Sequence, residues 1–244
     1  MSPVRALLDK EFRQLGRSRG ALVSGTLLPL LLLVLVPLPQ LAGLQAAPTV
    51  MPEGLPLPPG FSDIGQPQRL FALLLYPLFV TIAGLIVPSL AATYAIVQER
   101  ERRTLELLVA LPLSVRQILT AKLLSLLALG VVLVFPFFAI GVTIPLILNV
   151  ISAWQAVLLL LLLGAALVCS TCVALVLALL AKDFRTANNL NGVLFLPIIM
   201  LMAGVLVAVP GESKLIVMSA ALLGCAAVAL VMATRWISFE RYLE

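Results

Sequence analysis

Long apolar runs, separated by short polar connections, make up most of this chain. Six of the runs are long enough to cross a bilayer, because about 20 apolar residues in a helix match the thickness of the hydrocarbon core. They cover residues 21–41, 70–97, 118–140, 152–181, 188–209 and 215–234. The pattern predicts an all-α membrane protein with six transmembrane helices, built as one domain over residues 1–244.

In the first and third runs, prolines predict a change in the course of the helix. Pro29, Pro37 and Pro39 predict a kink in the first membrane helix, because proline removes a helical hydrogen bond. The third run continues apolar through Pro136 and Pro145, so we expect its far end to be broken or kinked. A cleaved signal peptide is the alternative for the first run, but the segment before it is long for a signal peptide and contains acidic residues.

A basic, amphipathic segment, residues 1–19, precedes the first run. Val4, Leu8, Phe12 and Leu15 recur at helical spacing, and arginines occupy another face. A helix of this kind lies in the membrane interface, with its apolar side among acyl chains and its arginines at lipid phosphates. We predict such an interfacial helix; a charged cytoplasmic tail is the alternative.

Two connections, after the first run and before the fourth, carry their own sequence signals. Residues 45–68 contain six prolines and three glycines, which favours an extended or polyproline loop over regular structure. Ser152 and Gln155 fit a capping box, in which the two side chains satisfy free backbone amides at a helix start. They predict the start of the fourth helix, with Trp154 at the water interface.

Composition and charge place the chain in the membrane class. It is 62% hydrophobic and 11% charged, whereas a soluble domain carries roughly 25% charged residues. Fourteen of the 16 basic residues fall on one side of the six-span arrangement. The positive-inside rule then places both termini in the cytoplasm of a multi-pass protein of the cell membrane, with the 45–68 loop outside. The net charge of +5 therefore indicates topology and does not indicate nucleic-acid binding.

Residues that carry chemistry are scarce. Histidine is absent and no charged residue lies in the middle of a run, which argues against an intramembrane enzyme and against proton-coupled transport. The chain has no P-loop motif, so energy from ATP would have to come from another subunit. We predict no catalytic residue, no cofactor and no metal site in this chain.

Cys169 and Cys172 form a C-x-x-C pattern, which elsewhere serves redox chemistry or metal binding. Here it lies within an apolar run that lacks histidine and acidic residues, so we interpret it as helix packing. Small residues at four-residue spacing, which allow close helix contacts, recur in the same run and in the sixth: Ser170, Ala174, Ala178, Ala220 and Gly224.

The longest charged segment, residues 98–117, joins the second and third runs. It opens with a cluster of both charge signs and then reads as a short, leucine-rich amphipathic helix, 104–110, which Pro112 ends. Ser114 and Gln117 fit a second capping box at the start of the third membrane helix. A leucine-rich helix held outside the membrane by charges offers a surface for another protein to bind.

The sequence E-R-E-R-R-T-L-E-L-L-V-A-L-P-L-S-V-R-Q-I-L-T-A-K within this region resembles the cytoplasmic segment of ABC type-2 permeases, the membrane subunits of one class of ATP-driven exporters. The matching positions are Glu99, Glu101, Thr104, Leu105, Glu106, Leu108, Pro112, Ser114 and Lys122. The resemblance extends to the six-span layout and to the N-terminal interfacial helix, which that family calls the elbow helix.

The resemblance implies a partner and a site. Residues 104–111 would form a coupling helix that docks into a groove of a separate ATPase subunit, which binds ATP and magnesium. The implied docking residues are Glu99, Glu101, Arg102, Arg103, Thr104, Leu105, Glu106, Leu107, Leu108, Leu111 and Pro112. Two permease chains, identical or related, would pair with two ATPases. The membrane parts would be residues 20–97 and 118–234, followed by a cytoplasmic tail, 235–244.

One feature departs from the family. Many members carry re-entrant helices between the fifth and sixth spans on the outer side. Residues 210–214 are too few to form them, unless the fifth run itself turns back. The sequence therefore does not decide which structure forms the outer gate.

Several functions fit this sequence. The leading one is the permease of an exporter for a lipid, a drug-like molecule or another amphiphile, because uncharged spans suit an amphiphile better than an ion. A haem-pathway exporter and a sodium exporter are alternatives within the same superfamily. The alternative from another class is a membrane anchor or assembly protein that recruits a cytoplasmic partner without transport.

Overall fold

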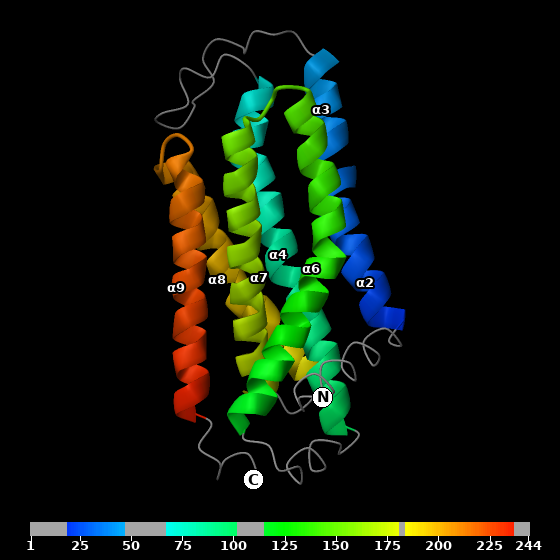
Figure 1. The fold of residues 1–244 in the computed structure, drawn as a ribbon, viewed down its shortest axis with the longest axis vertical. Helices are drawn as coiled ribbons and strands as arrows, with labels where there is room; N and C mark the ends of the chain where they lie inside the picture. Colours follow the sequence, from blue (N-terminus) through cyan, green and yellow to red (C-terminus); the bar gives the residue numbers. More distant parts are fainter. Residues whose placement is uncertain (1–18, 47–66, 102–114, 181–183, 237–244) are drawn as a thin grey trace.

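The structure is a computed structural model that describes residues 19–46, 67–101, 115–180 and 184–236. These ranges are helical and contain no strand. Six stretches of them are long and apolar enough to cross a membrane: Gly25–Gly43, Phe71–Leu90, Lys122–Ile147, Ala153–Leu177, Asn189–Ala208 and Ser213–Met232. The predicted all-α architecture with six spans is therefore confirmed (Figure 1).

The first span is interrupted, as its prolines predict. It consists of α2 (Arg19–Leu30), the π-helix η1 (Leu31–Leu35) and α3 (Pro37–Ala46). In η1 the N–H of Val36 donates to the carbonyl of Leu31, five residues back, at 2.9 Å. The chain thus accommodates one extra residue in a turn between two α-helices.

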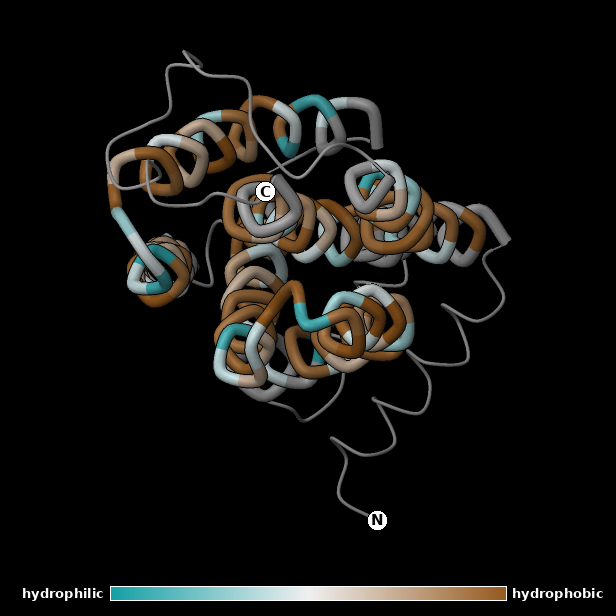
Figure 2. Tube along the Cα trace, turned by 90° about the horizontal axis from the view of Figure 1, so that it is seen from above, coloured by the Kyte–Doolittle hydropathy of each residue, from teal (hydrophilic) through white to brown (hydrophobic). Residues whose placement is uncertain are grey.

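Helix α4 (Pro67–Glu101) lies at the centre of the bundle and packs against α2, α6, α7 and α8. Seen from above, it has α8 on one side and the α6–α7 pair on the other (Figure 2). Its 35 residues correspond to about 52 Å of helix at 1.5 Å per residue. The helix continues through Glu101, so the first part of the predicted charged cluster belongs to the second membrane helix.

Helix α6 (Val115–Ile147) is a single helix that contains both Pro136 and Pro145. Of the two expected alternatives, a broken or a kinked far end, the break is excluded, because the helix is continuous; it bends along its length (Figure 1). A membrane helix tolerates proline when neighbouring groups satisfy the backbone that proline frees.

Helix α7 (Ala153–Leu180) begins at the predicted cap. The Ser152 hydroxyl accepts a hydrogen bond from the N–H of Gln155 at 3.0 Å, as a capping serine should. The Gln155 side chain does not complete the box. Its amide donates to the carbonyl of Ala72 on α4 at 3.4 Å, and it thereby joins two helices.

Helix α8 (Phe184–Ala208) and helix α9 (Ser213–Trp236) follow each other across a short turn. Helix α8 is continuous and does not turn back, so the described chain has no re-entrant pair between these two spans. Helix α9 lies beside α7, whereas α8 runs obliquely behind α7 (Figure 1).

The bundle has two distinct ends. One carries the α6–α7 and α8–α9 turns and is called the turn end below (Figure 1). At the other end, called the charged end, α4 finishes at Glu101 and α6 starts at Val115 (Figure 1). The first described residue, Arg19, and the last, Trp236, also lie at the charged end.

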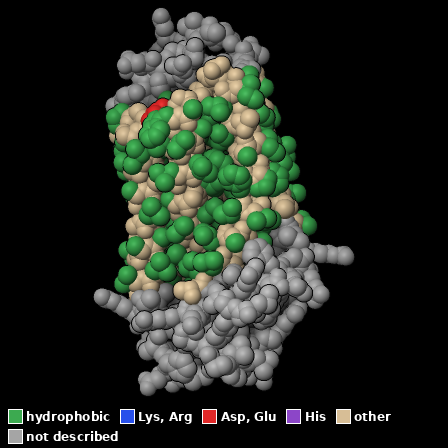
Figure 3. Space-filling view, viewed as in Figure 1, with side chains coloured by type: hydrophobic (Ala, Val, Ile, Leu, Met, Phe, Trp, Pro, Cys, Tyr) green, Lys and Arg blue, Asp and Glu red, His purple; other side chains and the backbone are tan. Residues whose placement is uncertain are grey.

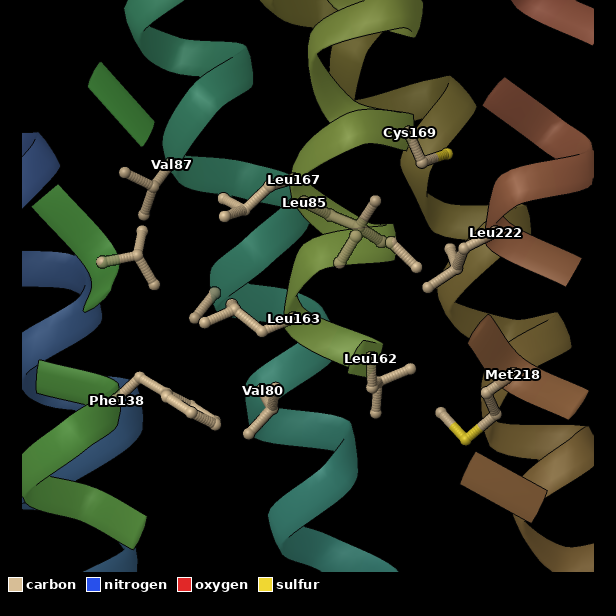
Figure 4. Close-up of a cluster of buried hydrophobic side chains, with 14 of the residues drawn as sticks. Val80, Leu85, Val87, Phe138, Leu162, Leu163, Leu167, Cys169, Met218 and Leu222 are labelled. Carbon is tan, nitrogen blue, oxygen red and sulfur yellow. The ribbon is translucent and has the colours of Figure 1, made fainter. Parts of the chain in front are cut away.

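The core is formed by apolar side chains from α4, α6, α7 and α9, such as Val80, Phe138, Leu162 and Leu222 (Figure 4). Many large hydrophobic side chains are exposed on the described helices, and they cover much of the face seen in the space-filling view (Figure 3). An apolar exterior over the height of a bundle is what lipid contact requires.

Several predicted features lie outside the described residues. They are the interfacial helix in residues 1–18, most of the proline-rich loop, the cap at Ser114 and the tail after Trp236.

Candidate functional site

The charged end brings together the two helices that flank the predicted docking segment. Helix α4 delivers the chain to Glu101, and α6 takes it up again at Val115. Two of the predicted docking residues, Glu99 and Glu101, lie in the last turn of α4. The others lie outside the described residues: Arg102, Arg103, Thr104, Leu105, Glu106, Leu107, Leu108, Leu111 and Pro112. The docking surface therefore stays a prediction. The segment that would form it joins the ends of two membrane helices.

Lys122 stands in α6 close to this end, at a position of the family motif. Its side chain is buried, and its carbonyl accepts a hydrogen bond from the Ser125 hydroxyl at 2.8 Å. The lysine at the start of the third span therefore belongs to the interior of the bundle and does not add to its surface.

Helix α4 is held by α7 through a close contact of small residues. A Cβ on Gly84 would lie 2.7 Å from the Cβ of Ala166, which is too close for two carbon atoms. Ser170, one turn further along α7, donates a hydrogen bond to the Leu85 carbonyl. Small residues and an interhelical hydroxyl bond are the usual means of joining helices in lipid.

The hydrogen bonds from α7 reach α4 beside its two internal prolines. Pro77 and Pro88 cannot donate to carbonyls four residues earlier, so each weakens the helix locally. The Gln155 amide bonds the Ala72 carbonyl near the first proline, and Ser170 bonds the Leu85 carbonyl near the second. Helix α7 thus braces α4 at both weakened positions.

The C-x-x-C pattern lies in the packed interior. Cys169 and Cys172 are both buried, and Cys169 points from α7 toward α9 (Figure 4). Among the described residues, no group of three metal-binding side chains comes together. The geometry agrees with the interpretation of this pattern as helix packing.

The two ladders of small residues differ in their surroundings. Ser170 and Ala174 on α7 are buried between helices, as predicted. Ala220 and Gly224 on α9 are exposed, and no atom lies within 4 Å of the place that a Gly224 Cβ would occupy. Within one copy of the chain, the second ladder therefore faces outward, and its role in close helix contacts stays a prediction.

Three helices meet at the π-helix. Tyr76 of α4 is 1% exposed, and its hydroxyl has no hydrogen-bond partner among the residues that the structure describes. A Cβ on Gly141 of α6 would lie 2.6 Å from this hydroxyl oxygen and would also clash with the carbonyl of Leu33 in η1. The sequence signalled the interruption of the first span through its prolines. It did not signal Tyr76 or Gly141, because the facing residues of other helices cannot be read from one helix.

These features define a multi-pass membrane protein: six apolar helices, with a central helix that leads to a charged segment. The family model of the ABC-2 family transporter protein matches residues 5–219. The chain therefore belongs to the ABC-2 transporter family. No curated protein and no solved structure matches it significantly.

Proposed function

We propose that this permease is the membrane half of an ATP-driven exporter for an amphiphilic substrate, and that residues 99–112 dock onto a separate ATPase subunit. ABC-2 permeases generally pair with ATPase subunits, and the chain has no P-loop of its own. The observation that carries the proposal is that α4 ends and α6 begins at the same end of the bundle, on either side of this segment in the sequence. A push on the segment would act directly on the central helix.

The orientation that suits this role has the charged end in the cytoplasm. The excess of basic residues on that side supports it through the positive-inside rule. ATP is available in the cytoplasm, so the docking segment must face that side. Two copies of the permease, or two related chains, would enclose the path across the membrane, since one bundle has a filled core.

The character of the spans supports an amphiphile as the substrate. Charged residues occur at the edges of the six spans and not in their middle. A path lined by such helices offers apolar surface to an acyl chain or a drug-like molecule, but few ligands to a bare ion.

A docking test compares leucine substitutions in the segment with a change elsewhere. Leu105→Asp and Leu108→Asp place a charge where an apolar anchor is expected. Burial of one leucine is worth about 1.5–3 kcal/mol, so we expect ATPase affinity to fall about tenfold to a hundredfold. Glu106→Ala should have a smaller effect, because charges at the rim of an interface act mainly on association rate.

The measurement is retention of the ATPase during purification of the membrane-inserted permease, together with transport of a fluorescent amphiphile into vesicles. Gln66→Asp, in the loop on the opposite side, is the control and should change neither. Full ATPase retention and full transport in both leucine variants would refute the docking assignment. Retention of the ATPase by the wild type without any transport would favour the anchor function instead.

A further inference from the structure

We propose that η1 is a hinge in the first span, and that the Tyr76 hydroxyl holds a second position of this hinge by donating a hydrogen bond to the Leu33 carbonyl. The hinge would move α3 at the turn end of the bundle. Its role in gating rests on the proposed function, whereas the existence of two positions can be tested without it.

The first step concerns the backbone of η1. Pro37 stands four residues after Leu33 and has no N–H, so the Leu33 carbonyl has no donor at its α-helical position. The bond from Val36 to Leu31 shows that the turn already contains one residue too many for an α-helix. If η1 changed from a π-helical to an α-helical turn, α3 would rotate and shift by about 1.5 Å, the rise of one residue. We take this α-helical turn as the second position of the hinge.

The second step concerns the unused donor. In a bilayer, a buried hydroxyl without a partner costs free energy, because no water can reach it. The Tyr76 hydroxyl and the Leu33 carbonyl are both in contact with the place where a Gly141 Cβ would stand, so the two oxygens are close neighbours. A second position of η1 in which they bond would gain a hydrogen bond that the described position lacks. This gain would offset the loss of the bond within η1, so that the two positions lie close in free energy.

The third step concerns the room for movement. Gly141 lets α6 lie directly against η1, with no side chain between the two backbones. A methyl group at this position would press on both oxygens and separate the helices. Glycine here therefore allows η1 to shift along α6 without a steric barrier.

The fourth step concerns transmission. Tyr76 and Glu101 belong to the same helix, α4, and their separation of 25 residues corresponds to about 38 Å. The bonds from α7 to the Ala72 and Leu85 carbonyls stiffen α4 beside its prolines. A displacement of the charged end therefore reaches Tyr76, and Tyr76 acts on η1.

The test measures the distance between spin labels at Gly43 on α3 and Ala153 on α7, both exposed, in the full chain in lipid nanodiscs. The three native cysteines are first replaced. We expect two distance populations in the wild type. Tyr76→Phe removes the hydroxyl alone and should shift their ratio about three- to tenfold, the effect of one interhelical hydrogen bond. Pro37→Ala restores the N–H that bonds the Leu33 carbonyl in an α-helical turn. It therefore stabilises the second position and should shift the ratio in the opposite direction.

Two matched controls isolate the effect. Thr143→Val deletes an exposed hydroxyl that bonds the Ala139 carbonyl of its own helix, and Gly204→Ala adds a methyl group where no atom lies within 4 Å. Neither should change the ratio, whereas Gly141→Ala should. In the Pro37→Ala background, Tyr76→Phe should change the ratio less than it does alone, because the introduced alanine already supplies a donor to the Leu33 carbonyl.

A single population in the wild type, or a ratio that Tyr76→Phe leaves unchanged, overturns the hinge. These distances are measured on the permease without the ATPase, so loss of docking would leave them unaffected. An intact hinge in a protein that fails the docking test would therefore refute the proposed function and leave this inference standing.

Discussion

At the scale of single residues, the contact between α4 and α7 depends on the absence of a side chain at Gly84. The Cβ of Ala166 already occupies the space that a substituent would need, at 2.7 Å. Nearby, Ser170 bonds the Leu85 carbonyl, so both small residues act at the same crossing of the two helices.

Gly84→Ala should destabilise the bundle by about 1–3 kcal/mol, the usual cost of overpacking a filled interior. Gly164→Ala is the matched control, because no atom lies within 4 Å of its Cβ position on the exposed face of α7. The measurement is the thermal unfolding midpoint of the purified permease in detergent. Equal midpoints for the two variants would mean that the close crossing does not hold the helices together.

Residue-level chemistry could be predicted only where it is local in sequence. The Ser152 cap follows from a pattern of four residues, and the structure confirms its hydrogen bond to Gln155. The partner of the Gln155 side chain is on another helix, 83 residues away in the chain, and no local pattern encodes it. The same holds for Gly84 and Gly141, whose importance comes from the residue that faces them.

At the scale of elements, α7 illustrates how a single cap sets a helix boundary. Ser152→Ala removes the acceptor for the N–H of Gln155 and should cost about 1 kcal/mol. Ser152→Asp keeps an acceptor and should retain most of this stability. The check is chemical unfolding of the two variants, followed by circular dichroism. The interpretation of Ser152 as a cap fails if Ser152→Asp loses as much stability as Ser152→Ala.

The hydrophobic pattern predicted the number of spans because hydrocarbon thickness fixes their length. It left open whether the far end of α6 is broken or kinked. The helix is not broken, since Pro136 and Pro145 do not break a helix whose neighbours support it. The hydrophobic pattern also placed the end of the second membrane helix too early, at residue 97. The charged residues up to Glu101 continue the helix beyond the apolar run, because charge ends a membrane span but does not end a helix.

At the scale of the whole molecule, the orientation of the bundle follows from charge. We expect residues 45–68 outside and residues 98–117 in the cytoplasm. Single cysteines at Ser62 and at Arg103, in a cysteine-free background, should therefore react from opposite sides of the membrane. The measurement is labelling of intact cells by an impermeant maleimide, with lysed cells as the control. Only the Ser62 variant should be labelled before lysis. Labelling of both variants from outside would contradict the six-span topology.

The two tight turns have a consequence for how this protein enters the membrane during synthesis. Helices α8 and α9 are separated by residues 209–212, and α6 and α7 by residues 148–152. So few residues cannot form a hydrated domain on the outer side of the membrane. We therefore expect each pair of helices to insert into the bilayer as one hairpin, so that only its short turn has to be translocated. The connection between α3 and α4 is about twenty residues long. Its translocation, rather than that of the later hairpins, is the demanding step of biogenesis.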